Sequence, residues 1–116
     1  MNLRTRWLWV VLLAAAFSAP AAPPVPLAGD ILGQVRNGAG IAQMGATVLL
    51  YNRYDELVRQ GLTGEQGRFG FDALAPGLYS IRVILASFVP AERRNIAVLP
   101  NSENRLDINL ASVLSS

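Results

Sequence analysis

The stretch 63–79 constrains the fold more than any other part of this 116-residue chain. It reads TGEQGRFGF, then DA, then LAPGLY. Gly67 and Gly77 are expected to supply the positive φ that tight turns require, and Pro76 presets the φ of its own turn. The stretch therefore predicts two turns, each followed by a strand.

Apolar side chains in the same stretch recur at a period of two. Phe69 alternates with Phe71, and Tyr79 alternates with Ile81. A period of two places these side chains on one face of a strand. We therefore assign Phe69, Phe71 and Tyr79 to the core, next to the turn residues Gly67, Pro76 and Gly77.

Alternation continues through the rest of the chain after residue 28. About seven strands are expected, over residues 30–36, 46–52, 57–63, 68–72, 78–85, 94–99 and 105–110. Segments 41–45 and 88–92 are expected to be irregular, the second because Pro90 cannot donate to a strand ladder. Turn signals recur about every eight to twelve residues and no helical period follows the leader, so the pattern favours an all-β, antiparallel β-sandwich over a barrel.

The N-terminus has the pattern of a secretory signal peptide. Residues 1–6 carry Arg4 and Arg6, residues 7–17 are apolar, and residues 18–22 are small apart from Pro20. Four prolines between residues 20 and 26 end the apolar run well short of the roughly 20 residues that an uncleaved membrane helix needs, which leaves that helix as the weaker alternative. We expect cleavage after Ala21.

The sequence therefore predicts four segments. Residues 1–21 form the signal peptide with its helix, 22–28 a Pro-rich linker, 29–111 the β-sandwich domain and 112–116 a tail. The expected location is periplasmic, outer-membrane associated or secreted, with membrane contact only through the transient leader.

Composition excludes several function classes. The chain has no Cys, His or Lys, and it therefore lacks disulfides, the commonest general base and the amine that forms Schiff bases. Once Arg4 and Arg6 leave with the leader, eight Arg balance eight Asp plus Glu, so the mature charge is 8 − 8 = 0. The mature chain therefore lacks the excess of basic residues that nucleic-acid binding needs. Neither an enzyme, a cofactor nor a metal site is expected.

Two charged pairs are candidate sites. Arg93-Arg94 fits a solvated strand edge better than a phosphate site. Asp55-Glu56 fits a hairpin tip better than a pair of catalytic carboxylates, because adjacent side chains in an extended segment point apart. No calcium-loop spacing of acidic residues is present.

The order of these motifs resembles the carboxypeptidase regulatory-like domain. The resemblance runs from about Gly29 to Leu110, through Ile31-x-Gly33-x-Val35, Gly45-Ala46-x-Val48, the stretch 63–79 and the alternating last strand. It implies a transthyretin-like sandwich of seven strands, used as a non-catalytic module beside metallocarboxypeptidases, at the front of TonB-dependent receptors and in exported bacterial proteins. The chain departs from the pattern at Gly64, where Asp is usual, and at Ser87, where Gly is usual.

Relatives of this architecture supply two activities that the sequence excludes and one that it leaves open. The purine-ring hydrolase needs histidines, and the internal isopeptide bond needs a lysine, and neither residue occurs. Sugar binding, as in starch-binding-like folds, needs exposed rings, for which Tyr51 and Tyr54 are the candidates. An interaction or spacer module needs no special residues, because an open sheet edge can accept a partner's strand.

The interaction or spacer role is therefore our first hypothesis, and a carbohydrate-binding module is the alternative. The partner would be a protein or a polysaccharide of the cell envelope. Whether the domain stands alone or begins a longer receptor-like protein stays open at this stage.

Overall fold

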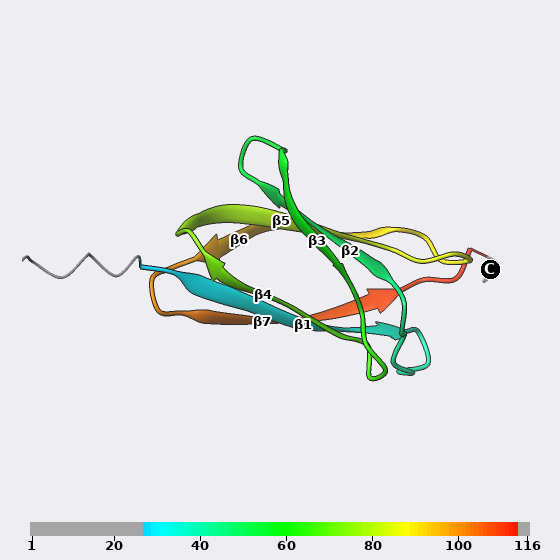
Figure 1. Ribbon diagram of the computed structural model, residues 1–116. Helices are drawn as coiled ribbons and strands as arrows, with labels where there is room; N and C mark the ends of the chain where they lie inside the picture. Colours follow the sequence, from blue (N-terminus) through cyan, green and yellow to red (C-terminus); the bar gives the residue numbers. More distant parts are fainter. Residues whose placement is uncertain (1–26, 114–116) are drawn as a thin grey trace, which may run out of the picture.

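The computed structural model describes residues 27–113, which form seven strands in two sheets (Figure 1). The strands are β1 Gly29–Asn37, β2 Thr47–Asn52, β3 Leu57–Leu62, β4 Arg68–Leu74, β5 Gly77–Ile84, β6 Ala91–Val98 and β7 Glu103–Leu110. One sheet has the order β4-β1-β7 and the other β3-β2-β5-β6. The all-β sandwich is confirmed. The predicted signal helix and the cleavage site at Ala21 lie outside the described residues.

The core lies between the two sheets and follows the period of two. In β2, Val48 and Leu50 are fully buried, while Thr47 and Leu49 face outward. In β4, the inward residues Phe69 and Phe71 meet with ring centroids 6.0 Å apart. Further buried apolar residues come from both sheets: Ile31, Val35, Ala46, Leu74, Ile81, Val83, Ile96, Val98, Ile108 and Leu110.

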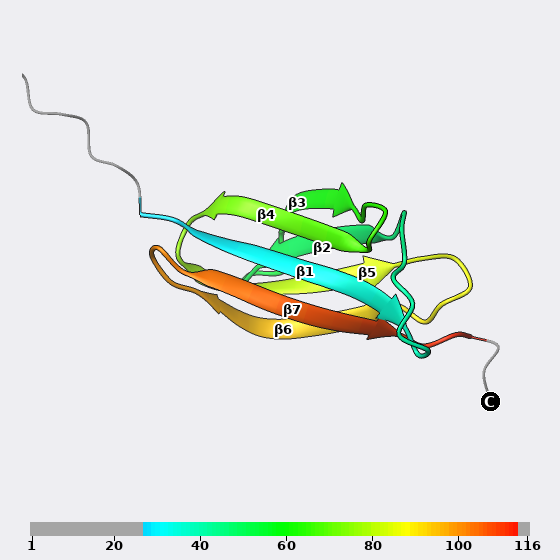
Figure 2. The same cartoon turned by 90° about the horizontal axis from the view of Figure 1, so that it is seen from below.

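Not all strands are antiparallel, so that part of the prediction is wrong. β1 and β7 run parallel over eight residue pairs, from Asp30 opposite Glu103 to Asn37 opposite Leu110 (Figure 2). The other four strand pairs are antiparallel. Side chains alternate between the two faces of a strand in parallel and in antiparallel ladders alike, so the sequence pattern could not distinguish the two kinds of pairing.

Residues 91 and 92 were expected to be irregular, but they belong to β6. Ala91 is paired with Val83 of β5, and this pairing extends the strand back to the residue after Pro90. The segment before Pro90 is also paired, since Phe88 forms an isolated antiparallel β-bridge with Ser112.

Of the two predicted turn glycines, only one has positive φ. Gly67 has a φ of 69°. The prediction is wrong for Gly77, which begins β5 and is not in the left-handed region. Near this turn the positive φ, 54°, falls on Ala73 inside β4, whose N–H donates to Asp30 Oδ1 at 3.1 Å. The irregularity therefore lies within β4, and the chain reverses at Ala75 and Pro76 between the two strands.

Thr63 is the buried polar residue of the described part of the chain. Its hydroxyl accepts from the Ala46 N–H at 2.9 Å and donates to the Gln43 carbonyl at 2.7 Å. Both partners belong to the segment before β2, so the side chain ties the end of β3 to the start of its neighbour. This threonine has a structural role with both hydrogen bonds made.

Candidate interaction surfaces

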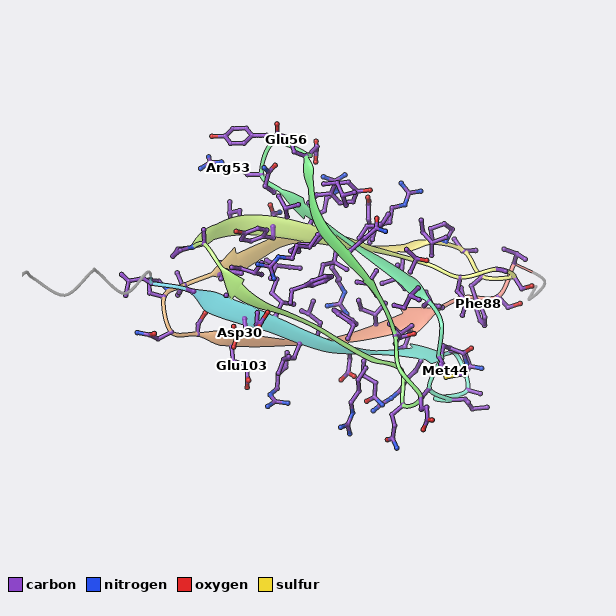
Figure 3. All side chains as sticks on the ribbon, viewed as in Figure 1. Asp30, Met44, Arg53, Glu56, Phe88 and Glu103 are labelled. Atoms are coloured by element: carbon purple, nitrogen blue, oxygen red, sulfur yellow. The ribbon has the colours of Figure 1, made fainter. Side chains whose placement is uncertain are left out.

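The β2–β3 hairpin carries both candidate tyrosines, and its tip is held by Asn52. The Asn52 Oδ1 accepts from the N–H groups of Tyr54 and Glu56, at 2.8 and 3.1 Å. Its Nδ2 donates to Glu56 Oε1 at 2.8 Å. Figure 3 shows Arg53 and Glu56 at this tip, which projects from the sandwich. These hydrogen bonds give the tip a defined shape.

The two tyrosines lie in different surroundings. Tyr54 is 72% exposed at the tip, with the Arg53 guanidinium carbon 5.6 Å from its ring centroid. Tyr51 is half-buried in β2, opposite Leu57 and Ser80, on the outer face of the four-stranded sheet. Within residues 27–113 the ring pair in contact is Phe69–Phe71. The tyrosines therefore share a hairpin but do not stack on each other.

A polar hollow of about 210 Å³ lies beside the tip. Asn52, Arg53 and Asp55 line one side of it, and β5 and β6 form the other side with Leu78, Tyr79, Ser80, Arg94 and Asn95. Asp55 lies 4.0 Å from Arg94, whereas Glu56 bonds Asn52. The adjacent acidic residues thus have different partners, as expected for a hairpin tip.

Tyr79 lines this hollow but also serves the fold. Its hydroxyl donates to the Ala75 carbonyl at 2.6 Å, and its ring packs against the core. This bond spans the β4–β5 reversal that contains Pro76 and Gly77, so Tyr79 fastens the turn to the sheet.

A second hollow, of about 460 Å³, lies on the three-stranded sheet. Arg36, Arg68 and Arg105 line it together with Asp107. Arg105 pairs with Glu103 at 2.9 Å, and Arg36 donates to the Gln34 side chain at 2.5 Å. The guanidinium groups are spread over β1, β4 and β7, and they share the surface with acidic residues.

Two arginines bridge the two sheets at the open sides of the sandwich. Arg59 of β3 faces inward, as does its partner Leu50, and its Nη1 donates to the Asp72 carbonyl of β4 at 2.7 Å. Arg93 of β6 donates in the same way to the Asp107 carbonyl of β7. Each guanidinium spans from an edge strand of one sheet to an edge strand of the other.

The sequence reasoning missed this role. The available signal was a charged residue at an inward position of the alternation, as at Arg59, since a charge at such a position needs a polar partner. Arg93-Arg94 does lie at a strand edge, where Arg94 pairs with Glu92 and Asp55.

These strands and turns match a known family. The model of the carboxypeptidase regulatory-like domain matches residues 30–111, most of the chain. The chain belongs to this family. The match covers all seven strands of the carboxypeptidase regulatory-like domain, including the parallel last strand. No curated protein sequence is similar enough to match the chain.

Solved structures share the fold of this carboxypeptidase regulatory-like domain at low sequence identity. The Bacillus anthracis TIE protein is 20% identical, with a TM-score of 0.66 over 75% of this chain and 18% of that one. BcpA, the major pilin subunit of Bacillus cereus, is 17% identical, with a TM-score of 0.62 over 75% of this chain and 31% of that one. A putative carbohydrate binding protein from Bacteroides uniformis is 15% identical, with a TM-score of 0.57 over 74% and 42%.

This chain spans less than half the length of each of those three proteins. In the described part of the domain, no helix has the length and hydrophobicity needed to cross a membrane.

Proposed function

We propose that this chain is an exported, non-catalytic module that acts as an interaction or spacer domain at the cell envelope. One observation carries the proposal: in residues 27–113 the buried side chains are apolar apart from Thr63, whose hydroxyl is used by two backbone groups. In residues 27–113 no charged side chain is buried. The inward surface is devoted to packing.

Export is supported by the leader pattern of residues 1–21 and by the fold. Likeness to a major pilin subunit supports a location outside the cytoplasm. The domain holds together without cysteine, so it needs no oxidising compartment to become stable.

Cell fractionation of the full chain with a C-terminal tag tests the proposal. We expect the tagged protein in the envelope or the medium, with a mass that lacks the leader. A matched control replaces Arg4 and Arg6 by Glu, which removes the basic n-region and should retain the protein in the cytoplasm. Recovery of the unaltered chain from the cytosol with Met1 intact would contradict the proposal.

Carbohydrate binding is the second candidate, and the exposed ring of Tyr54 beside the polar hollow favours it. Exposed rings stack on sugars, and the asparagine, arginine and aspartate side chains around the hollow can hydrogen-bond hydroxyl groups. The fold likeness to a putative carbohydrate binding protein from Bacteroides uniformis adds support.

Titration with soluble oligosaccharides, followed by tyrosine fluorescence, separates the two candidates. A saturable response that Tyr54→Ala abolishes and Tyr54→Phe keeps would establish the sugar-binding function, because phenylalanine retains the ring. Tyr51→Ala tests whether the outer face of the sheet takes part. A flat titration with all of these proteins leaves the interaction or spacer role.

A further inference from the structure

We propose that the free edge of β3 pairs antiparallel with β3 of a second copy, joining two four-stranded sheets into one of eight strands. The inference rests on the proposed interaction role and names its partner and its surface. The sandwich has four edge strands, β4 and β7 in one sheet and β3 and β6 in the other.

Two edges are occupied by groups of the same molecule. On β4, the Arg68 carbonyl accepts from the Gly64 N–H at 3.0 Å, and the Asp72 carbonyl accepts from Arg59. On β7, the Asp107 carbonyl accepts from Arg93. Just beyond β7, Ala111 accepts from the Val89 N–H at 2.8 Å. An added strand would have to displace these donors.

The β6 edge is protected in other ways. Pro90 precedes the strand, and Asn95 has a φ of 57° where the pairing with β5 shifts. Asn104 of β7 donates to the Ala97 carbonyl at 3.1 Å. An added strand would meet Pro90, which cannot donate to a ladder, and would have to displace the Asn104 side chain.

In residues 27–113 no hydrogen bond from outside its own sheet reaches the backbone of Gln60 or Leu62 on the free side of β3. The pairing of β3 with β2 shifts by one residue between Arg59 and Leu57, so the irregularity of this strand lies at Val58 and leaves residues 59–62 regular. The Thr63 N–H donates to the Ala46 carbonyl, so the backbone of Thr63 faces the neighbouring strand. Backbone direction alternates along a strand, and the N–H and C=O groups of Gln60 and Leu62 therefore face outward. No proline interrupts this strand, and its apolar side chains are exposed: Leu57 is 50% exposed, Val58 43% and Leu62 67%.

A second copy fits this edge because the strand is complementary to itself about a two-fold axis at Gln60. Antiparallel pairing would set Gln60 against Gln60 and Leu62 against Val58 of the second copy. Arg59, the charged residue of β3, would face Gly61 of the second copy, so like charges do not oppose each other. The same strand serves both copies, as in any two-fold interface.

The overall charge also permits self-association. Residues 27–113 carry eight Arg and eight Asp plus Glu, a net charge of 8 − 8 = 0. Proteins far from neutrality repel their own copies, and this domain does not. One strand pair is a small interface, so we expect a weak dimer, with a Kd on the order of 10–100 μM.

Sedimentation velocity of the exported full-length product, from about 5 μM to 1 mM, tests the proposal. We expect the mean mass to rise from monomer toward dimer. Gln60→Pro should abolish this rise, because it removes an outward N–H that has no partner in the monomer. Gln60→Thr is the matched control, since it keeps the N–H and suits a strand. Its dimer should persist.

A charge exchange tests the register. Gln60→Glu and Gln60→Lys should each stay monomeric, because each places like charges opposite one another. An equimolar mixture of the two should dimerise, with association lost at high salt. Rescue in the mixture requires residue 60 to face residue 60, which only the proposed register provides.

Three outcomes would overturn the inference: an unaltered protein that stays monomeric at 1 mM, a dimer that Gln60→Pro leaves intact, or a charge mixture without rescue. Capture of a different protein strand by β3, with no self-association, would also overturn it. None of these outcomes alters the fractionation result, so failure of the dimer and failure of the exported role can be told apart.

Discussion

Replacing Gly67 by alanine should be among the most damaging single changes in the domain. Gly67 has a φ of 69°, and an added Cβ would lie 2.4 Å from the Val35 carbonyl oxygen and 3.0 Å from the Gln43 nitrogen. Val35 lies in the central strand β1, where its N–H donates to the Gly67 carbonyl at 2.8 Å and its carbonyl accepts from Gln43 at 2.9 Å. The backbone around the new methyl group therefore has little freedom to move away.

Two further glycines separate the causes of the loss. Gly45 has a φ of 80° with nothing within 4 Å of an added Cβ. Gly77 has neither a left-handed backbone nor a close neighbour, since its nearest atom is 4.0 Å away. All three changes to alanine restrict the unfolded chain similarly, a stabilising effect of about 0.4–1 kcal/mol that cancels when the variants are compared with Gly77→Ala.

Relative to Gly77→Ala, we expect Gly45→Ala to lose about 1–2 kcal/mol through backbone strain alone. Gly67→Ala should lose about 2–5 kcal/mol, since overlap in a packed region adds about 1–3 kcal/mol. Urea unfolding followed by circular dichroism measures these differences, with about 1 kcal/mol moving the midpoint by roughly 1 M in a domain of this size. Equal midpoints for Gly67→Ala and Gly77→Ala would refute the reasoning.

Three other predictions test separate features. The exported form should begin at residue 22, after cleavage at Ala21, and intact-mass spectrometry decides this. Tyr79→Phe removes the bond to the Ala75 carbonyl and should lower the free energy of unfolding by about 0.5–1.5 kcal/mol, measured in urea. Ser87 has a φ of 74°, and Ser87→Gly should raise the free energy of unfolding by up to about 1 kcal/mol because glycine adopts this φ without strain. Ser80→Gly, in the middle of β5, should lower the free energy of unfolding by about 0.5–1 kcal/mol.

The sequence predicted the candidate site only in part. The sequence placed Tyr51 and Tyr54 on one hairpin, which is correct. It could not tell that Asn52 folds the tip and separates the rings, because this depends on three hydrogen bonds across the loop. The polar hollow brings the hairpin beside Arg94 and Asn95 of β6, which are about 40 residues away in the chain.

The sequence by itself determined the strands, the core and one turn. Alternating apolar residues bury the same side chains whatever their neighbours, so Phe69 and Phe71 were assigned to the core from local pattern alone. Tyr79, assigned to the core with them, packs against it but is only partly buried. Gly67 was identifiable too, since its turn lies within five residues of chain. These are local properties that the backbone and the adjacent side chains impose.

The tertiary structure decided which strands became neighbours. The parallel pairing of β1 with β7, the positive φ at Ala73 in place of Gly77, and the arginine contacts from Arg59 to β4 and from Arg93 to β7 all followed from that choice. Each depends on segments distant in sequence meeting in one register, and a period of two is the same for every partner a strand could take. The open edge of β3 is likewise a property of the assembled sheets, because an edge exists only once the other strands have found their places.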